Sequence, residues 1–163
     1  MVFGELDGSR SPRALALLEA CAGAGIDAEL SADITRAVWE KFVLLAALSA
    51  TTTTIRTPIG PIRANPQART LLHDAMREVV AVGRALGVAL PLDFADNRLA
   101  FADGLPAQMT SSMHNDLERG NRLEVPWLSG AVVELGRKAG VATPVHRAVA
   151  DILAVHADGR PSV

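Results

Sequence analysis

The feature that most constrains the fold is a helical segment whose middle is apolar on every side. Residues 34–50 read ITRAVWEKFVLLAALSA, and the stretch from Phe42 to Ala50 contains no charged residue. A helix that is apolar all round must be surrounded by other elements. The run is far shorter than the roughly 20 residues that cross a membrane. The segment therefore predicts a central helix of a globular domain that does not span a membrane.

The composition favours helices around this segment. Aromatic residues make up 4% of the chain and tyrosine is absent, whereas strands are usually rich in aromatic and β-branched residues. Apolar segments separated by Gly and Pro predict further helices at 66–86, 91–101, 112–120, 126–140 and 144–156. The threonines at 51–54 are expected to weaken or distort the end of the apolar helix at 34–50. Only the first thirty residues differ, because they predict a strand, a helix and a strand at 2–6, 12–22 and 26–30.

Charge and reactive residues exclude several classes of function. The net charge of −2 gives no electrostatic reason to bind nucleic acid or an anionic membrane. No cationic start precedes an apolar core of the secretory kind, so a cytoplasmic protein is expected. The four histidines are far apart in the sequence and lack metal-ligand spacing, which places them at the surface or at helix caps. No metal site is predicted.

A polar segment from Thr110 to Glu124 contrasts with the surrounding Ala-, Leu- and Val-rich sequence. Ser112 and Asp116 are four residues apart, so they share a helix face. Glu124 follows the expected end of this helix at Gly120 and precedes Pro126. This arrangement could bind a small polar ligand. The alternative is a capped, solvated helix that begins at Ser111 or Ser112.

A single lysine lies within the apolar helix. Lysine is rarely buried without a partner, and desolvation lowers the pKa of its ammonium group. Lys41 could therefore act as a general acid or hold a carboxylate in a cleft. The alternative is that its ammonium reaches water from a partly buried helix.

Together these segments resemble the C-terminal domain of the ketopantoate reductase (2-dehydropantoate 2-reductase) family. The resemblance rests on Trp39-Glu40-Lys41, on Ser111-Ser112-Met113-His114-Asn115-Asp116 and on Glu124. Three further segments support it, namely Gly4 to Ser9, Pro58-Ile59-Gly60 and Gly140 to Pro144. The resemblance implies a mainly α fold, a helical bundle like those of ketopantoate reductase and 6-phosphogluconate dehydrogenase-like proteins, with a short β-α-β remnant at its start.

The resemblance also implies roles for individual residues. In an intact enzyme of this kind, NADPH delivers hydride to a small 2-oxo acid, in the service of pantothenate biosynthesis. Lys41 would protonate or polarise the developing alkoxide. Glu124 would hydrogen-bond a hydroxyl of the substrate or of the cofactor ribose and tune Lys41. Ser112 would bind the substrate carboxylate, and Asp116 would order the polar face. Lys41, Ser112 and Glu124 are thus expected in one cleft.

The chain departs from the family in two ways. No Gly-x-Gly-x-x-Gly motif is present, so residues 1–30 resemble only the end of a dinucleotide-binding domain and residues 31–163 a helical substrate and dimerisation domain. This chain alone is therefore expected to bind no NADPH and to be inactive. Leu45 and Ser49 also replace two asparagines that the family often carries, and Ser49 is left as a weaker substrate-binding candidate. The open alternative is a non-catalytic helical module that forms homodimers or docks onto a separate domain.

Overall fold

The computed structural model describes residues 1–160, and its contacts group the chain into two units, Met1–Lys41 and Phe42–Val163. The division falls inside helix α2 (Ile34–Ile55), whereas the sequence predicts a domain boundary at residue 30. The assignment of residues 1–30 to a separate domain stays a prediction. The predicted fold class is confirmed, since residues 1–160 contain eight α-helices and one small sheet.

The first unit is a minimal β-α-β arrangement. Strand β1 (Val2–Phe3) pairs in parallel with β2 (Glu29–Leu30), and α1 (Pro12–Gly23) connects them. Both strands are shorter than the sequence predicts. Gly4 allows the chain to pass close to β2, because a Cβ at this position would lie 2.6 Å from the carbonyl oxygen of Ser31.

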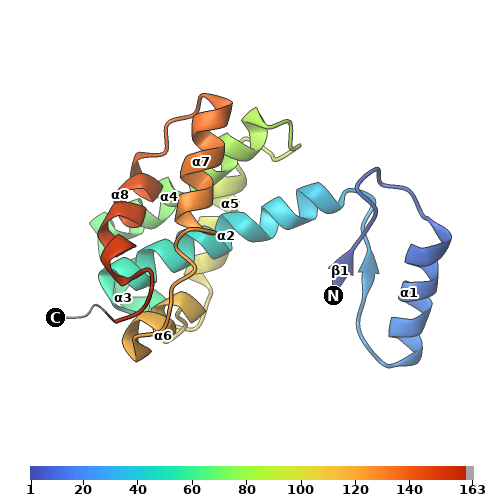
Figure 1. The fold of residues 1–163 in the computed structure, drawn as a ribbon, viewed down its shortest axis with the longest axis horizontal. Coiled ribbons are helices and arrows are strands. Elements are labelled where there is room, and N and C mark those ends of the chain that lie inside the picture. The colour runs from blue at the N-terminus through green and yellow to red at the C-terminus, as the bar shows by residue number, and fades with distance from the viewer. Residues whose placement is uncertain (161–163) are drawn as a thin grey trace. The chain divides into compact units, whose positions relative to one another are not determined.

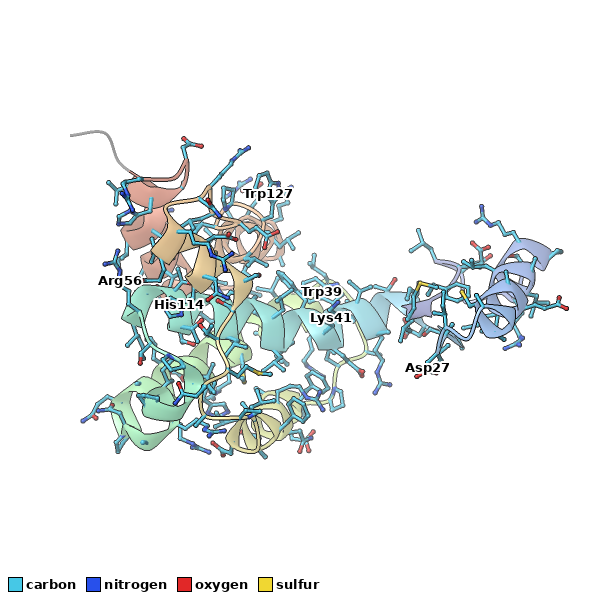
Figure 2. The ribbon with its side chains drawn as sticks, turned by 90° about the horizontal axis from the view of Figure 1, so that it is seen from below. Asp27, Trp39, Lys41, Arg56, His114 and Trp127 are labelled. Atoms are coloured by element: carbon cyan, nitrogen blue, oxygen red, sulfur yellow. The ribbon has the colours of Figure 1, made fainter. Side chains whose placement is uncertain are left out.

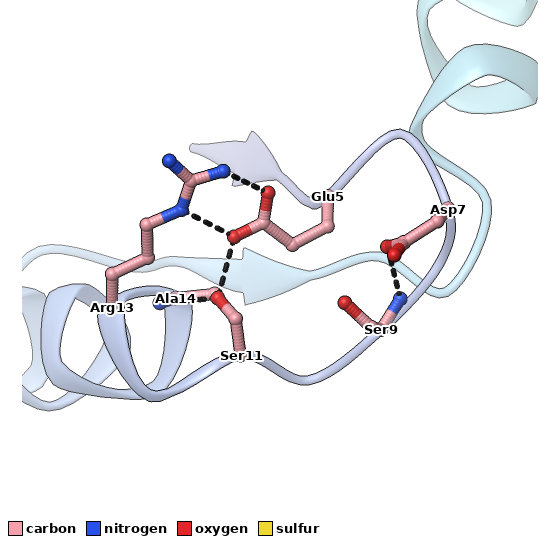
Figure 3. Close-up of polar contacts among 6 residues, drawn as sticks. All are labelled: Glu5, Asp7, Ser9, Ser11, Arg13 and Ala14. Atoms are coloured by element: carbon pink, nitrogen blue, oxygen red, sulfur yellow. Dashed lines mark hydrogen bonds and ion pairs between the residues drawn. The ribbon is translucent and has the colours of Figure 1, made fainter.

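A carboxylate at the start of α1 stabilises this unit (Figure 3). Glu5 accepts hydrogen bonds from Arg13 Nε at 2.6 Å, from Arg13 Nη2 and from the Ser11 hydroxyl. The Ser11 hydroxyl in turn accepts from the N–H of Ala14 and caps the helix. The bonds from Arg13 and Ser11 lower the pKa of Glu5 to about 2.

The second unit is a bundle of helices organised around α4 (Figure 1). Helix α4 (Pro66–Ala85) packs against α3 (Ile59–Ala64), α5 (Phe94–Asp103), α7 (Ser129–Ala139) and α8 (Pro144–Leu153). Helix α6 (Ser112–Arg119) and the 3-10 helix η1 (Ala154–His156) complete the unit. One core cluster joins α2, α6, the turn after α6, and α8 through Ala50, Met113, Leu117, Leu123, Val125, Leu128, Val149 and Leu153.

Three helix boundaries differ from the sequence prediction, and one of them is the start of α5, which lies at Phe94 instead of Pro91. Helix α2 continues through the threonine run to Ile55. Thr51 and Thr52 are fully buried, and their hydroxyls donate back to the carbonyls of Ala47 and Leu48, so their polar groups are satisfied within the helix. Helix α7 begins at Ser129 instead of Pro126, because residues 125–128 form a turn in which the Glu124 carbonyl accepts the N–H groups of Trp127 and Leu128.

The placement of one histidine also differs from the prediction. His146 is fully buried between α4 and α7. Its Nδ1 lies 3.1 Å from the Ser129 hydroxyl and its Nε2 lies 3.1 Å from the Ala75 carbonyl oxygen. Burial lowers the pKa of His146 to about 4, so the ring is neutral near neutral pH. A neutral imidazole with both nitrogens hydrogen-bonded is compatible with a core position.

No helix within residues 1–160 is long and apolar enough to cross a membrane.

Candidate functional site

The start of helix α6 is anchored to the second half of α2 by a series of hydroxyl groups. The N–H of His114 donates to Ser111 Oγ at 3.1 Å, which makes Ser111 the N-cap of α6. Ser111 Oγ lies 2.9 Å from Thr52 Oγ1, and the Thr52 hydroxyl is 2.7 Å from the Leu48 carbonyl oxygen. In a consistent assignment each group donates to the next. The N–H of His114 donates to Ser111, the Ser111 hydroxyl to Thr52, and the Thr52 hydroxyl to the carbonyl of Leu48. This set of hydrogen bonds fixes where α6 begins relative to α2.

Ser112 is the first residue of α6 and is exposed. Its neighbour Ser111 makes the cap. The Ser112 hydroxyl itself makes no hydrogen bond within residues 1–160. A hydroxyl that is free at a rigidly held helix start can bind an anionic group there, because the helix dipole favours negative charge at this end. The substrate-carboxylate role of Ser112 stays a prediction.

Ser49 lies on α2 among buried residues, with a side chain only 1% exposed. Its hydroxyl has no hydrogen-bond partner within the described chain. Ser49 precedes Thr52 and Thr53 by three and four residues, so the three hydroxyls share one helix face. Leaving a buried hydroxyl unpaired costs about 1–3 kcal/mol. A buried hydroxyl without a protein partner is usually satisfied by an enclosed water molecule or a bound group.

The two acidic candidates have different surroundings. Asp116 is half-buried on α6, where its Oδ1 accepts from Asn121 Nδ2 at 3.0 Å and its carbonyl accepts from the Asn121 N–H. This bonding supports an ordering role for Asp116. Glu124 is exposed in the segment between α6 and the turn at 125–128, and its carboxylate has no hydrogen bond or ion pair within residues 1–160.

Lys41 is an exposed residue of α2 (Figure 2). The neighbouring carboxylate of Glu40 is paired with Arg36 at 2.7 Å along the same helix. Lys41 and Leu45 are four residues apart on α2, so they point to the same side of the helix. Lys41 belongs to the first unit, whereas Ser112 and Glu124 belong to the second. Their convergence in one cleft therefore stays a prediction.

The hydroxyls that hold α6 in place were not among the predicted site residues. Thr52 and Ser111 are both buried and joined across 59 positions of sequence. A signal was present, because Ser49, Thr52 and Thr53 recur at helical spacing directly after the Ala- and Leu-rich stretch 44–48. The sequence alone could not show which later hydroxyl would meet them.

The described residues do not fit the pyrophosphate of a dinucleotide. Such a group binds backbone N–H groups at the start of a helix that follows a strand. Helix α1 follows β1, but the Glu5 carboxylate already lies beside its cap, bonded to Ser11 (Figure 3). A second anion would meet this charge. No group of three or more His, Cys, Asp or Glu within residues 1–160 could hold a metal ion.

A comparison with protein-family models identifies the family of the chain. The family model described as ketopantoate reductase PanE/ApbA C terminal matches residues 33–157. The chain belongs to the ketopantoate reductase family. The matched range contains Lys41, Ser49, Ser112, Asp116 and Glu124.

Known members of the ketopantoate reductase family give the same result. The 2-dehydropantoate 2-reductase of Archaeoglobus fulgidus is 32% identical over 151 residues, covering 92% of this chain and 50% of that protein. The crystal structure of 2-dehydropantoate 2-reductase from Methylococcus capsulatus matches with a TM-score of 0.84 and 28% identity, covering 94% of this chain and 53% of that one. A dimeric ketopantoate reductase from Staphylococcus aureus shares the fold, with a TM-score of 0.83 and 22% identity over 91% of this chain and 52% of its own. The chain spans about half the length of the curated relatives that it matches.

Proposed function

We propose that this chain is the substrate-binding and catalytic half of a ketopantoate reductase-like, NADPH-dependent 2-oxo acid reductase. The observation that carries the proposal is the family match over residues 33–157, which includes every residue of the candidate site. The exposed Ser112 at a helix start and the unpaired hydroxyl of Ser49 support it. The electrons would come from a nicotinamide held by a nucleotide-binding half, which the described residues do not provide.

The proposed roles follow from the chemistry of each side chain. Reduction of a 2-oxo acid places negative charge on the former carbonyl oxygen, and a lysine ammonium at that oxygen stabilises the charge and supplies a proton. Lys41 takes this role. Ser112 donates to the substrate carboxylate, and Glu124 hydrogen-bonds a hydroxyl of substrate or cofactor ribose. Asp116, held by Asn121, acts as a positioning residue.

The substrate class follows from the same face of α2. Leu45 cannot hydrogen-bond a substrate hydroxyl, and it is partly exposed on the side of the helix that carries Lys41. A 2-oxo acid with an apolar side chain is therefore a better match than 2-dehydropantoate itself. If 2-dehydropantoate were the substrate, the enzyme would act in pantothenate biosynthesis. We also propose a homodimer in the cytoplasm, in line with the relative from Staphylococcus aureus that is described as dimeric.

The proposal can be tested with a chimera that joins the nucleotide-binding half of the Archaeoglobus fulgidus relative to this chain. We expect the chimera to oxidise NADPH in the presence of a 2-oxo acid, and the chain alone to show no saturable heat when titrated with NADPH. Lys41→Met should lower kcat by about a hundredfold or more, the usual contribution of a general acid. Lys138→Met is the matched control, because Lys138 is an exposed lysine on α7 paired with Glu134.

Equal rates for Lys41→Met and Lys138→Met would contradict the role of Lys41. A second readout is independent of the chimera: NMR spectra of the labelled chain titrated with 2-dehydropantoate and with 3-methyl-2-oxobutanoate, which lacks its hydroxymethyl group. We expect shifts at Ser49 and Ser112, larger for the less polar acid. An inactive chimera together with no shifts for either acid would favour the non-catalytic module.

A further inference from the structure

A polar cavity outside the candidate site lies where three helical elements end. It has a volume of about 240 Å³ and lies between the ends of α2 and α6 and the turn that follows η1. Its polar lining consists of Arg56, Glu118, Asn121, His156 and Arg160. Arg56 projects from the end of α2 and is labelled in Figure 2. None of these residues belongs to the site proposed for the 2-oxo acid.

The charges in this cavity do not cancel. Neither Arg56 nor Arg160 makes an ion pair or a side-chain hydrogen bond within residues 1–160. Of the nearby carboxylates, Asp116 accepts a hydrogen bond from Asn121, and Asp158 lies 3.8 Å from Arg122. Glu118 lies 3.9 Å from His114, and this contact is an ion pair only when the histidine is protonated. Two guanidinium groups thus line one small cavity that has a single carboxylate, Glu118, in its lining.

The backbone at Arg56 adopts a conformation that is costly for a residue with a side chain. Five helices of the chain end with the same N–H to carbonyl bond between residues five apart, at Ile26–Cys21, Thr57–Thr52, Val88–Gly83, Asn121–Asp116 and Val141–Gly136. The residue before the donor is left-handed in each, a position that glycine normally takes. Four of them are Gly25, Gly87, Gly120 and Gly140.

Arg56 is the exception, with φ at +56°, and it is the only residue other than glycine with positive φ within residues 1–160. A residue with a Cβ is strained in this conformation. The same chain places glycine at four equivalent ends. The arginine at the fifth is therefore better explained by what its guanidinium does than by what the turn requires.

The second arginine is also held in place. The N–H of Arg160 donates to the Gly120 carbonyl oxygen at 3.1 Å. Its side chain lies against Gly120, where a Cβ would be 3.3 Å from both Cβ and Nε of Arg160. The absence of a side chain at Gly120 thus leaves room for this guanidinium beside the cavity.

We propose that this cavity binds the phosphate group of a small molecule or free inorganic phosphate. A phosphate offers enough acceptor oxygens for two guanidinium forks and the Asn121 amide, and arginine binds phosphate through paired N–H groups. A lone carboxylate would engage only one fork in this way. The proposal goes beyond the reductase role and does not depend on it.

The test is a titration of the ¹⁵N-labelled chain with inorganic phosphate, at constant ionic strength in a phosphate-free buffer. We expect saturable shifts at the N–H groups of Gly120, Asn121 and Arg160. Arg56→Gly should weaken binding by about tenfold, the loss of roughly one charge-assisted hydrogen bond. This variant also relieves the left-handed strain, so it should fold at least as stably as the wild type. Arg160→Gln should weaken binding in the same way.

Two comparisons make the outcome decisive. Arg77→Gln is the matched control, since Arg77 is an exposed arginine of α4 outside the cavity, and it should leave the affinity unchanged. Acetate should bind more weakly than phosphate, whereas a phosphate monoester such as glycerol phosphate should bind at least as well if the natural ligand is an ester. Absence of saturation, or an affinity equal in Arg56→Gly and the wild type, would overturn the proposal.

Discussion

At the scale of single residues, the structure gives each buried hydroxyl near α6 a distinct role. Thr52 and Ser111 use their hydroxyls to connect α2 to α6, whereas Ser49 leaves its hydroxyl without a partner in the described chain. The first two are structural. Ser112 is exposed, whereas Ser49 is buried, and contact of either hydroxyl with a substrate stays a prediction.

We predict that Thr52→Val lowers the free energy of unfolding by about 1–2 kcal/mol, because the buried Ser111 hydroxyl loses its acceptor. Urea denaturation followed by circular dichroism measures the change. Thr70→Val is the control: the Thr70 hydroxyl donates to the carbonyl four residues before it on α4, as Thr52 does on α2, but Thr70 is exposed and contacts no second helix through this group. A loss as large for Thr70→Val as for Thr52→Val would show that the cross-helix bond contributes nothing.

At the scale of elements, one carboxylate and one imidazole join three helices. Glu78 of α4 accepts the N–H groups of Val145 and His146 at 2.7 and 3.0 Å, and so caps the start of α8. The imidazole of His146, on α8, hydrogen-bonds the Ala75 carbonyl of α4 and the Ser129 hydroxyl of α7. Burial raises the pKa of Glu78 and lowers that of His146 to about 4.

We predict that stability falls as the pH is lowered from 7 to 5. Between the unfolded pKa of histidine, about 6.5, and the folded value, the unfolded chain takes up a proton that buried His146 does not. The free energy of unfolding should therefore drop by about 2 kcal/mol between pH 7 and pH 5. Glu78 acts in the opposite direction, because its raised pKa makes the folded chain take up a proton more readily as the pH falls.

Urea unfolding of the wild type at both pH values, beside His146→Leu and His156→Gln, measures this dependence. His146→Leu should be less stable at pH 7 but should lose much less on acidification. His156→Gln should keep the wild-type slope. A slope unaffected by His146→Leu would assign the pH dependence to other groups.

At the scale of the whole molecule, the small sheet is the least protected part. It consists of β1 and β2 alone within residues 1–160, and two strands without further partners are marginal in water. Met1, Val2 and Leu6 on and near β1 are largely exposed. Open strand edges of this kind pair readily with another chain.

We predict that the chain self-associates through this edge, with a second copy across a two-fold axis. Sedimentation velocity should show a dimer, and Val2→Lys should shift it toward monomer, because a charge at a strand edge opposes pairing. Leu92→Lys is the control, since Leu92 is 83% exposed outside the sheet. A stable wild-type monomer at high concentration, or a dimer equally stable in Val2→Lys, would refute association through β1.

The sequence by itself determined most of the helices and the family, whereas the roles of the site residues stay predictions. Apolar periodicity and glycine or proline stops placed α1, α4, α6 and α8 close to their observed bounds, because these signals act within one or two turns of chain. The motif around Lys41, Ser112 and Glu124 indicated the family that the comparison confirmed. Only the tertiary structure decided that the threonines at 51–54 continue α2, that His146 is buried, and that Arg56 and Arg160 share a cavity. Each of these depends on a partner far away in the sequence, such as Ser111 for Thr52. A local sequence pattern does not specify which distant group will hydrogen-bond a buried hydroxyl or imidazole, or whether a distant carboxylate will pair with an arginine.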